Sequence, residues 1–296
     1  MMNAFTRATD ALTSVLPFRS GKPKAGTRIS PLAVVDPRAI IGEGCEIGPF
    51  CVVGSDVILG TGNKLLSHVV VTGHTTIGRD NVFHPHSVIG GAPQDKKYRG
   101  EATGLQIGDR NQIREVVTIH TGTEQGGRIN GGGVTRVGSD NLLMVNCHIG
   151  HDAQIGDGCV LANNVMIAGH IVVGDHVILN GGVGINAFVT IGSYSYVAGY
   201  ARIHHDIPPF VKVSDDARIR GLNGVGLKRA GFTEQQIAGL EEATRSLFGR
   251  RKPQSVAVTE LEGRYNGQMP QHVRQILDFL KRRNAGKHGR YLESLR

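Results

Sequence analysis

Two histidines and a carboxylate stand close together in the stretch NCHIGHDAQIGDG, residues 146–158. His148 and His151 are three residues apart, and Asp152 directly follows the second histidine. An imidazole beside a carboxylate is typical of a general base, because the carboxylate fixes the tautomer and stabilises the imidazolium. The same pair also suits a metal site, where carboxylates orient histidine ligands. A third interpretation is that all three are solvated residues on the outside of a repeat.

The segments that would position these residues follow a strict period of six. Large aliphatic residues occupy every sixth position from Ile29 to Ile89, the positions Ile107, Ile113 and Ile119, and every sixth position from Val137 to Ile203, with only Phe83 as an exception. Neither a helix, with its period of about 3.6, nor an ordinary strand, with its period of about 2, produces this spacing. The 26 positions predict a solenoid of short strands, each with one large side chain pointing inward.

A second inward position follows four residues after each aliphatic residue and is usually small or β-branched. All four cysteines occupy it, so we expect buried, reduced thiols at Cys45, Cys51, Cys147 and Cys159. The cysteines show neither CxxC pairing nor the spacing of zinc ligands. Glycine often follows the aliphatic residue, as in Ile41-Gly42, and we expect these glycines at corners, where a side chain would crowd the turn.

This repeat resembles that of the hexapeptide-repeat family. The resemblance implies a left-handed parallel β-helix of triangular cross-section, with three hexads in each coil. One coil beyond His151 the chain reaches Gly169, beside His170, so these residues are expected to cluster with Asp152 on adjacent coils. A glycine amide in that place could stabilise an oxyanion.

The period is interrupted twice, at residues 90–106 and 120–136. Both segments are polar and rich in glycine, which is typical of loops that leave a solenoid and carry function. The period ends at HDIPPF, residues 205–210, so we assign the β-helix to residues 29–206. Residues 1–28 are predicted to be an N-terminal extension.

Residues 207–296 are predicted to form a small helical domain. Thr233 and Gln236 have the spacing of a capping box, which indicates a helix from there to about Phe248. A second helix is predicted over 270–283, with apolar residues on one face.

The charge is uneven along the chain. Residues 207–296 carry 17 lysines and arginines against 9 acidic residues, whereas residues 29–206 carry 11 against 15. The basic end is expected to attract an acidic partner, and the body of the chain is not a nucleic-acid surface by charge. No stretch approaches the ~18 apolar residues of a membrane span.

Several longer motifs resemble those of one enzyme family, the UDP-N-acetylglucosamine acyltransferases, which catalyse the first step of lipid A synthesis. The strongest match is SDNLLMVNCHIGHDAQIGDGCVLANNVMIAGH, residues 139–170. The others are SHVVVTGHTTIGRDN (67–81), PQDKKYRGE (93–101), IGDRNQIREVVTIHTGT (107–123) and GLNGVGLKRAGF (221–232). Together they cover roughly residues 29–250 in the family's order.

The resemblance implies a role for each matching position. His151 corresponds to the general base that deprotonates the glucosamine 3-hydroxyl, Asp152 to its orienting carboxylate, and Gly169 to the backbone amide that stabilises the thioester oxyanion. The positions implied to bind substrate or carrier are Gln94, Asp95, Lys97, His148, His170, Asn223 and Arg229, together with Gly199, which corresponds to the position that limits acyl length.

The expected reaction moves a 3-hydroxyacyl group from acyl carrier protein to the 3-position of UDP-N-acetylglucosamine. We expect a homotrimer, because the family builds its sites between neighbouring solenoids. We also expect the protein to be cytoplasmic. No metal is expected, and no bound cofactor beyond the carrier's own phosphopantetheine. Acyl carrier proteins are acidic, so the basic C-terminal domain fits the donor that the resemblance implies.

Some positions depart from the family pattern and keep alternatives open. The family's VHQF is INAF here, with Asn186 in place of a histidine, and Val225 replaces an expected glutamate. The loop within 121–136 is also about five residues longer. A 3-amino sugar acceptor, an acetyl-CoA donor and a catalytically silent solenoid therefore stay possible. So does a zinc site that uses His120, His148 and His151, because some hexapeptide-repeat proteins that resemble carbonic anhydrases bind zinc through histidines from neighbouring subunits.

Overall fold

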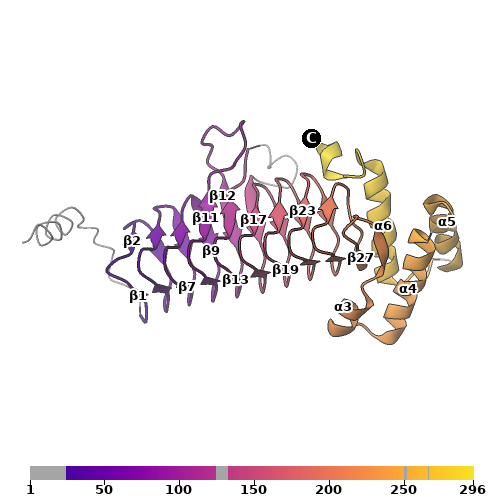
Figure 1. Cartoon of the computed structure of the whole chain (residues 1–296), viewed down its shortest axis with the longest axis horizontal. Helices are drawn as coiled ribbons and strands as arrows, with labels where there is room; N and C mark the ends of the chain where they lie inside the picture. Colours follow the sequence, from indigo (N-terminus) through magenta and orange to yellow (C-terminus); the bar gives the residue numbers. More distant parts are fainter. Residues whose placement is uncertain (1–24, 125–132, 250–251, 266) are drawn as a thin grey trace, which may run out of the picture.

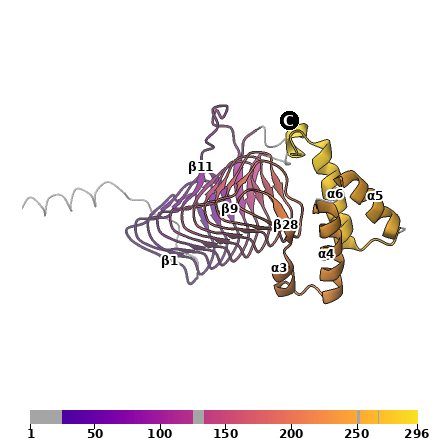
Figure 2. The same cartoon turned by 45° about the vertical axis from the view of Figure 1, so that its right-hand side comes forward.

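Three sheets of short strands wind into an elongated β-helix, with a group of helices at its C-terminal end (Figure 1). The computed structural model describes residues 25–124, 133–249, 252–265 and 267–296. Within these ranges each of the 26 predicted inward positions lies in its own strand, from β1 to β26. The left-handed parallel β-helix predicted from the sequence is confirmed, as is the helical C-terminal part. Figure 2 shows the stacked coils in an oblique view.

The strands fall into three sheets according to their position in the coil. Sheet A contains β1 (Arg28–Ile29), β4 (Glu46–Ile47), β7 (Lys64–Leu65), β10 (Val82–Phe83), β13 (Gln112–Ile113), β16 (Leu142–Leu143), β19 (Val160–Leu161), β22 (Ile178–Leu179), β25 (Tyr196–Val197), β27 (Val211–Val213) and β28 (Ile219–Leu222). Sheet B contains β2 (Val34–Val35), β5 (Val52–Val53), β8 (Val70–Val71), β11 (Val88–Gly91), β14 (Thr118–His120), β17 (His148–Ile149), β20 (Met166–Ile167), β23 (Gly184–Ile185) and β26 (Arg202–Ile203). Sheet C contains β3 (Ile40–Ile41), β6 (Val57–Leu59), β9 (His74–Ile77), β12 (Gly104–Ile107), β15 (Val134–Val137), β18 (Gln154–Ile155), β21 (Val172–Val173) and β24 (Thr190–Ile191).

The register shows where the coil is regular and where it is enlarged. Asn63 and Asn81 are stacked partners 18 residues apart, whereas Asn81 and Asn111, and then Asn111 and Asn141, are 30 residues apart. The extra residues leave the β-helix between β11 and β12 and between β14 and β15. Both insertions therefore start at the corner between sheets B and C, and the first is the long loop above the β-helix in Figure 1. Residues 125–132 of the second insertion are outside the described ranges.

At several positions where glycine follows the aliphatic residue, the neighbouring coil leaves no room for a side chain. A Cβ at Gly48 would lie 1.5 Å from the carbonyl oxygen of Leu66, one coil further along. The left-handed corner conformation falls two residues later, for example at Phe50, with φ 59°. The predicted crowding is thus real, but it comes from the adjacent coil instead of from the turn itself.

The core of the β-helix is aliphatic and contains the four cysteines as buried free thiols, as predicted. Burial raises the pKa of Cys147 to about 11 and that of Cys159 to about 12, so both stay protonated.

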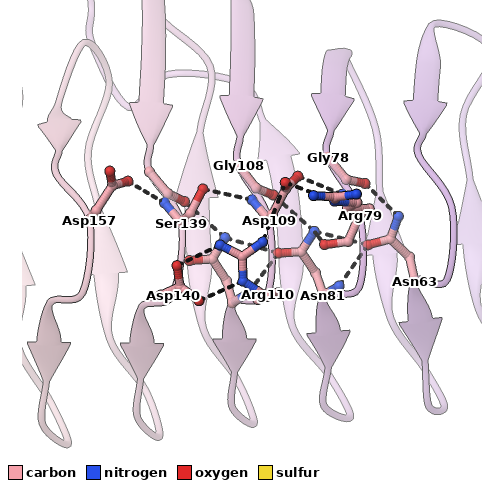
Figure 3. Close-up of polar contacts among 12 residues, drawn as sticks. Asn63, Gly78, Arg79, Asn81, Gly108, Asp109, Arg110, Ser139, Asp140 and Asp157 are labelled. Carbon is pink, nitrogen blue, oxygen red and sulfur yellow. Dashed lines mark hydrogen bonds and ion pairs between the residues drawn. The ribbon is translucent and has the colours of Figure 1, made fainter.

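Four inward positions hold asparagine, which the pattern of small and β-branched residues did not predict. Asn63, Asn81, Asn111 and Asn141 form a ladder along the corner between sheets C and A, in which each side-chain oxygen accepts a hydrogen bond from the backbone N–H of the next asparagine at 2.9–3.0 Å. The last oxygen accepts from the Cys159 N–H at 2.7 Å. Figure 3 shows part of this ladder, with the ion pair between Arg110 and Asp140 beside it.

The helical part is larger than predicted. The capping box at Thr233 is present and opens α4 (Glu234–Phe248), and the second predicted helix is α6 (Gln271–Ala285). Three further elements were not predicted: α3 (Gly224–Arg229), α5 (Gln254–Tyr265) and the 3₁₀ turn η1 (Leu292–Leu295). These helices enclose a second core that includes Phe210, Leu240, Leu261 and Ile276.

Parallel pairing continues a few residues past the predicted domain boundary after residue 206. Ile207 still bridges to Ile191, and β27 still pairs in parallel with β25. β28 then pairs antiparallel with β27 and ends the sheet. At the other end, the described part of the predicted extension already enters the first strand at Arg28, and residues 1–24 are outside the described ranges.

Candidate functional site

His151 and Asp152 lie between β17 and β18, on the same corner between sheets B and C at which both insertions start. Asp152 occupies the left-handed corner position, with φ 61°, and is only 1% exposed. Its backbone N–H donates to Thr135 Oγ1 at 2.7 Å. The β-helix corner thereby fixes the carboxylate in the protein interior, while the adjacent His151 is only partly covered.

The carboxylate of Asp152 holds the imidazole of His151. Asp152 Oδ2 lies 2.7 Å from His151 Nδ1 and accepts from Thr123 Oγ1 at 2.7 Å, and Oδ1 accepts from the Thr123 N–H at 2.8 Å. Burial alone would raise the pKa of Asp152, but the hydrogen bonds from His151 and Thr123 outweigh it and lower the pKa. An ionised carboxylate only accepts, so the proton of neutral His151 sits on Nδ1 and leaves Nε2 as the acceptor.

Gly169 lies directly against the His151 ring. A Cβ at position 169 would be 2.6 Å from both Nε2 and Cε1 of His151, so the ring occupies the space of a side chain. In the part of the chain that the structure describes, the Gly169 N–H has no hydrogen-bond acceptor. The acceptor nitrogen and an unused backbone donor are therefore next to each other.

A pocket of about 250 Å³ opens in front of this pair. Its lining combines three parts of the chain: the first inserted loop, the corner of three successive coils, and residue 296. The lining residues are Asp95, Lys97, His151, Gly169, His170, Ala187, Phe188 and Arg296.

A stack of rings forms one wall of the pocket. Phe188 stacks on His170 at 4.8 Å between ring centroids, and His170 meets His151 edge-on at 5.0 Å. Burial lowers the pKa of His170, so its imidazole is neutral near pH 7. His170 Nδ1 lies 3.7 Å from Asp152 Oδ2, beyond hydrogen-bonding distance.

His120 and His148, the other two histidines of the possible zinc site, lie outside the pocket. His148 is on sheet B, where Nδ1 contacts Thr118 Oγ1 at 2.8 Å, and its ring meets that of His120 at 4.8 Å. Within the described ranges, the one group with metal-ligand spacing is His151, Asp152 and His170, and two of its ligand atoms already share a hydrogen bond. The zinc trio of His120, His148 and His151 is thus not assembled within the single chain.

Comparison with known proteins relates this site to a family. A family model described as UDP N-acetylglucosamine O-acyltransferase, domain 2, matches residues 206–289, and the bacterial transferase hexapeptide model matches residues 135–169. The chain is 42% identical over 201 residues to an acyl-[acyl-carrier-protein]–UDP-N-acetylglucosamine O-acyltransferase of an Anaeromyxobacter species, covering 68% of this chain and 76% of the relative. The chain belongs to this acyltransferase family.

Solved structures of UDP-N-acetylglucosamine acyltransferases have the same fold. The enzyme from Bacteroides fragilis superposes with a TM-score of 0.80 at 36% identity, over 86% of this chain and 96% of that one. The enzyme from Acinetobacter baumannii gives 0.78 at 41% identity, over 84% and 95%. The similarity therefore includes both the β-helix and the C-terminal helices.

Five of the substrate positions expected of an acyltransferase do not line the pocket of the single chain. Gln94 is exposed on the first loop, and His148 faces outward on sheet B. Gly199 lies at the corner between sheets A and B, away from the corner that holds His151. Asn223 is the N-cap of α3 and donates to the Tyr194 carbonyl at 2.8 Å, and Arg229 is in the last turn of that helix. Their substrate roles stay predictions, and Asn223 has a structural role that the sequence did not suggest.

The two departures from the acyltransferase pattern lie in different parts of the molecule. Asn186, next to the pocket residue Ala187, forms a 2.8 Å hydrogen bond from Nδ2 to His204 Nδ1. Val225 is exposed on α3.

Three further residues of the site were missed by the sequence analysis. Phe188 follows His170 at the same coil spacing that connects His151 to Gly169, so this spacing could have found it. Thr123 ends the matching motif of residues 107–123 and lies near the start of a predicted loop, but no role was predicted for its side chain. Arg296 had no signal, because nothing in the sequence connects the end of a helical domain to the middle of the β-helix.

Within the described ranges, no helix is long and apolar enough to cross a membrane.

Proposed function

We propose that this acyltransferase moves a 3-hydroxyacyl group from acyl carrier protein to the 3-hydroxyl of UDP-N-acetylglucosamine, the first step of lipid A synthesis. The observation that carries the proposal is the arrangement of His151 between an ionised carboxylate and the unused Gly169 N–H in a chain of this family. It offers a base and an oxyanion donor at one point, which is what attack of an alcohol on a thioester needs.

In the proposed mechanism, His151 Nε2 takes the proton of the sugar 3-hydroxyl as the oxygen attacks the thioester carbonyl carbon. Asp152 stabilises the imidazolium that forms, and the Gly169 N–H donates to the oxyanion of the tetrahedral intermediate. The carbon–sulfur bond then breaks, and the phosphopantetheine thiolate leaves and takes the proton from His151. The products are the 3-O-acyl sugar nucleotide and free carrier thiol.

A homotrimer is supported by where exposed apolar side chains gather on the β-helix. Most lie on sheet B or on the corner between sheets A and B: Leu32, Val34, Phe50, Val52, Leu66, Val116, Val145, Met166 and Tyr200. The predicted substrate residues His148 and Gly199 share this face. In a ring of three copies, it would meet the His151 corner of the next copy, and the separated residues would come together.

The basic C-terminal domain supports an acidic acyl carrier protein as donor. The cytoplasmic location and the absence of a bound metal or cofactor stay predictions.

Product analysis tests the proposed function. We expect the full-length protein, mixed with UDP-N-acetylglucosamine and a panel of 3-hydroxyacyl carrier thioesters, to give a product whose mass increases by one acyl group. Mild alkali should cleave this product, because it is an ester. An alkali-stable product from a 3-amino sugar nucleotide would favour the amide-forming alternative raised by Asn186 and Val225, and product from acetyl-CoA alone would reject the donor.

A further inference from the structure

The chain returns to the β-helix after α6. Residues 287–296, the C-terminal segment, run from the helical domain back along the side of the β-helix that carries the inserted loops (Figure 1). Asp206 N donates to the Gly289 carbonyl at 2.8 Å, and Asp206 Oδ2 accepts from the Tyr291 N–H at 2.9 Å. Arg290 also donates to the His204 carbonyl at 2.8 Å. These contacts fix the segment next to the pocket.

Asp206 anchors both the segment and the β-helix. Its other carboxylate oxygen accepts from the Thr190 N–H at 2.7 Å, and the residue is only 2% exposed. A buried carboxylate that accepts backbone hydrogen bonds from both partners gives the segment a defined register.

This register places Arg296 at the pocket. The guanidinium carbon lies 5.7 Å from the centroid of Phe188, over the ring that stacks on His170. Among the residues that the structure describes, no carboxylate pairs with the Arg296 side chain, whereas the nearby Arg290 pairs with Glu293 at 2.6 Å. An exposed guanidinium over an aromatic face is held in place while its donors stay available.

Arg296 lies beside a part of the pocket that has fewer available polar side chains than the family pattern provides. In the segment INAF, the amide of Asn186 is engaged by His204, and Ala187 has no polar side chain where the family's VHQF has glutamine. Arg296 lines the same pocket as Ala187 and adds a cation there.

We propose that Arg296 binds a phosphate group of a substrate at the rim of the pocket and so supplies a contact that INAF lacks. This inference rests on the proposed function. The planar guanidinium favours phosphate, because it can donate two parallel hydrogen bonds. The phosphate has two possible sources, the diphosphate of the sugar nucleotide and the phosphodiester of the carrier's phosphopantetheine.

Calorimetric binding to the full chain tests the inference, with UDP-N-acetylglucosamine and 4′-phosphopantetheine as separate probes. We expect Arg296→Ala to weaken the binding of one probe about tenfold, as for the loss of one charge-assisted contact, and Arg296→Lys to recover part of it. The probe that responds identifies the source. Arg274→Ala, which removes an exposed charge on α6, serves as the control and should change neither affinity.

The inference is wrong if the wild-type chain binds neither probe or if Arg296→Ala changes both affinities by less than about twofold. Measuring acyl-product formation with the same protein preparations distinguishes failure of this inference from failure of the proposed function. Acyl transfer with unchanged binding in the variant would reject the role of Arg296 alone. Arg296-dependent binding without any acyl product would reject the proposed reaction alone.

Discussion

At residue 169, the space of a side chain is filled by the ring of another residue. The His151 imidazole approaches the Gly169 backbone so closely that even a methyl group would contact Nε2 and Cε1. The glycine therefore serves two purposes in the proposed mechanism, since it admits the base and presents a backbone donor beside it. Neither purpose requires Gly169 to adopt a backbone conformation that other residues avoid.

Gly169→Ala is expected to displace the imidazole and to lower kcat at least about tenfold, because loss of one oxyanion donor or of base geometry has effects of this size or larger. Gly54→Ala is the matched control. It lies on a corner between sheets B and C, as Gly169 does, but outside the pocket lining, and there the nearest atom to a new Cβ is 3.5 Å away. Equal activities of the two variants in a steady-state acyl-transfer assay would contradict the assigned geometry.

Acid stability depends on a buried histidine next to the site. Burial lowers the pKa of His120 to about 4 from 6.5, and His148 and His151 add to the shift. Between these values the unfolded chain binds a proton that the folded chain does not, so the free energy of unfolding falls as the pH is lowered through this window.

Urea unfolding at several pH values and one protein concentration measures this effect. His120→Gln should reduce the slope of unfolding free energy against pH by at most about 1.4 kcal/mol per pH unit, the equivalent of one proton. If plots of unfolding free energy against pH run parallel for the wild type and the variant, His120 titrates alike in the folded and unfolded states, and the prediction is wrong.

At the scale of the coil, the asparagine ladder joins regular and enlarged coils. Asn111 donates from Nδ2 to Asn81 Oδ1 and to the Gly138 carbonyl, and its own oxygen accepts from the Asn141 N–H. These groups are buried, so each depends on a protein partner. The ladder thus keeps the coils in register where the two loops leave the β-helix.

Asn111→Ala should lower the free energy of unfolding by about 2–4 kcal/mol, because it leaves several buried polar groups unsatisfied. Gln112→Ala, one residue later on the exposed side of β13, is the control and should change it by less than about 0.5 kcal/mol. Chemical denaturation compares them, and similar losses in both variants would mean that the ladder adds little.

The sequence predicted the coils well, because each hexad must bury one large aliphatic side chain, and this need repeats in every strand. It predicted His151, Asp152, Gly169 and His170 as a cluster with the help of the family resemblance, which implied three hexads in each coil and so converted sequence spacing into contact. The asparagines were missed because a buried polar residue is compatible with the core only when its neighbours complete a ladder. The contact of Arg296 was missed because it depends on how two cores meet, which no local pattern encodes.

At the scale of the whole molecule, sheet B and its neighbouring corner present an apolar face that a single chain leaves exposed. Val52 on β5 and Ile58 on β6 are both 40% exposed, but they lie on different sheets. Only Val52 belongs to the face proposed to be covered in the trimer. The pair therefore distinguishes the interface from the general surface.

Light scattering should give the wild-type protein a mass about three times that of the 31.7 kDa chain. Val52→Glu is expected to shift the population toward smaller species, because association would bury a charge. Ile58→Glu should leave the mass unchanged. A wild-type mass of one chain, or equal effects of both variants, would reject this face as the interface.

The most direct test of the mechanism is the turnover of His151→Ala. The variant should still unfold cooperatively, at a lower melting temperature, because the buried Asp152 carboxylate loses its hydrogen bond to His151 but keeps those from Thr123. We predict that kcat for acyl transfer to UDP-N-acetylglucosamine falls roughly 10²–10⁴-fold, the usual contribution of a general base. Turnover close to that of the wild type, in a variant that is folded at the assay temperature, would contradict the assignment of His151 as the base.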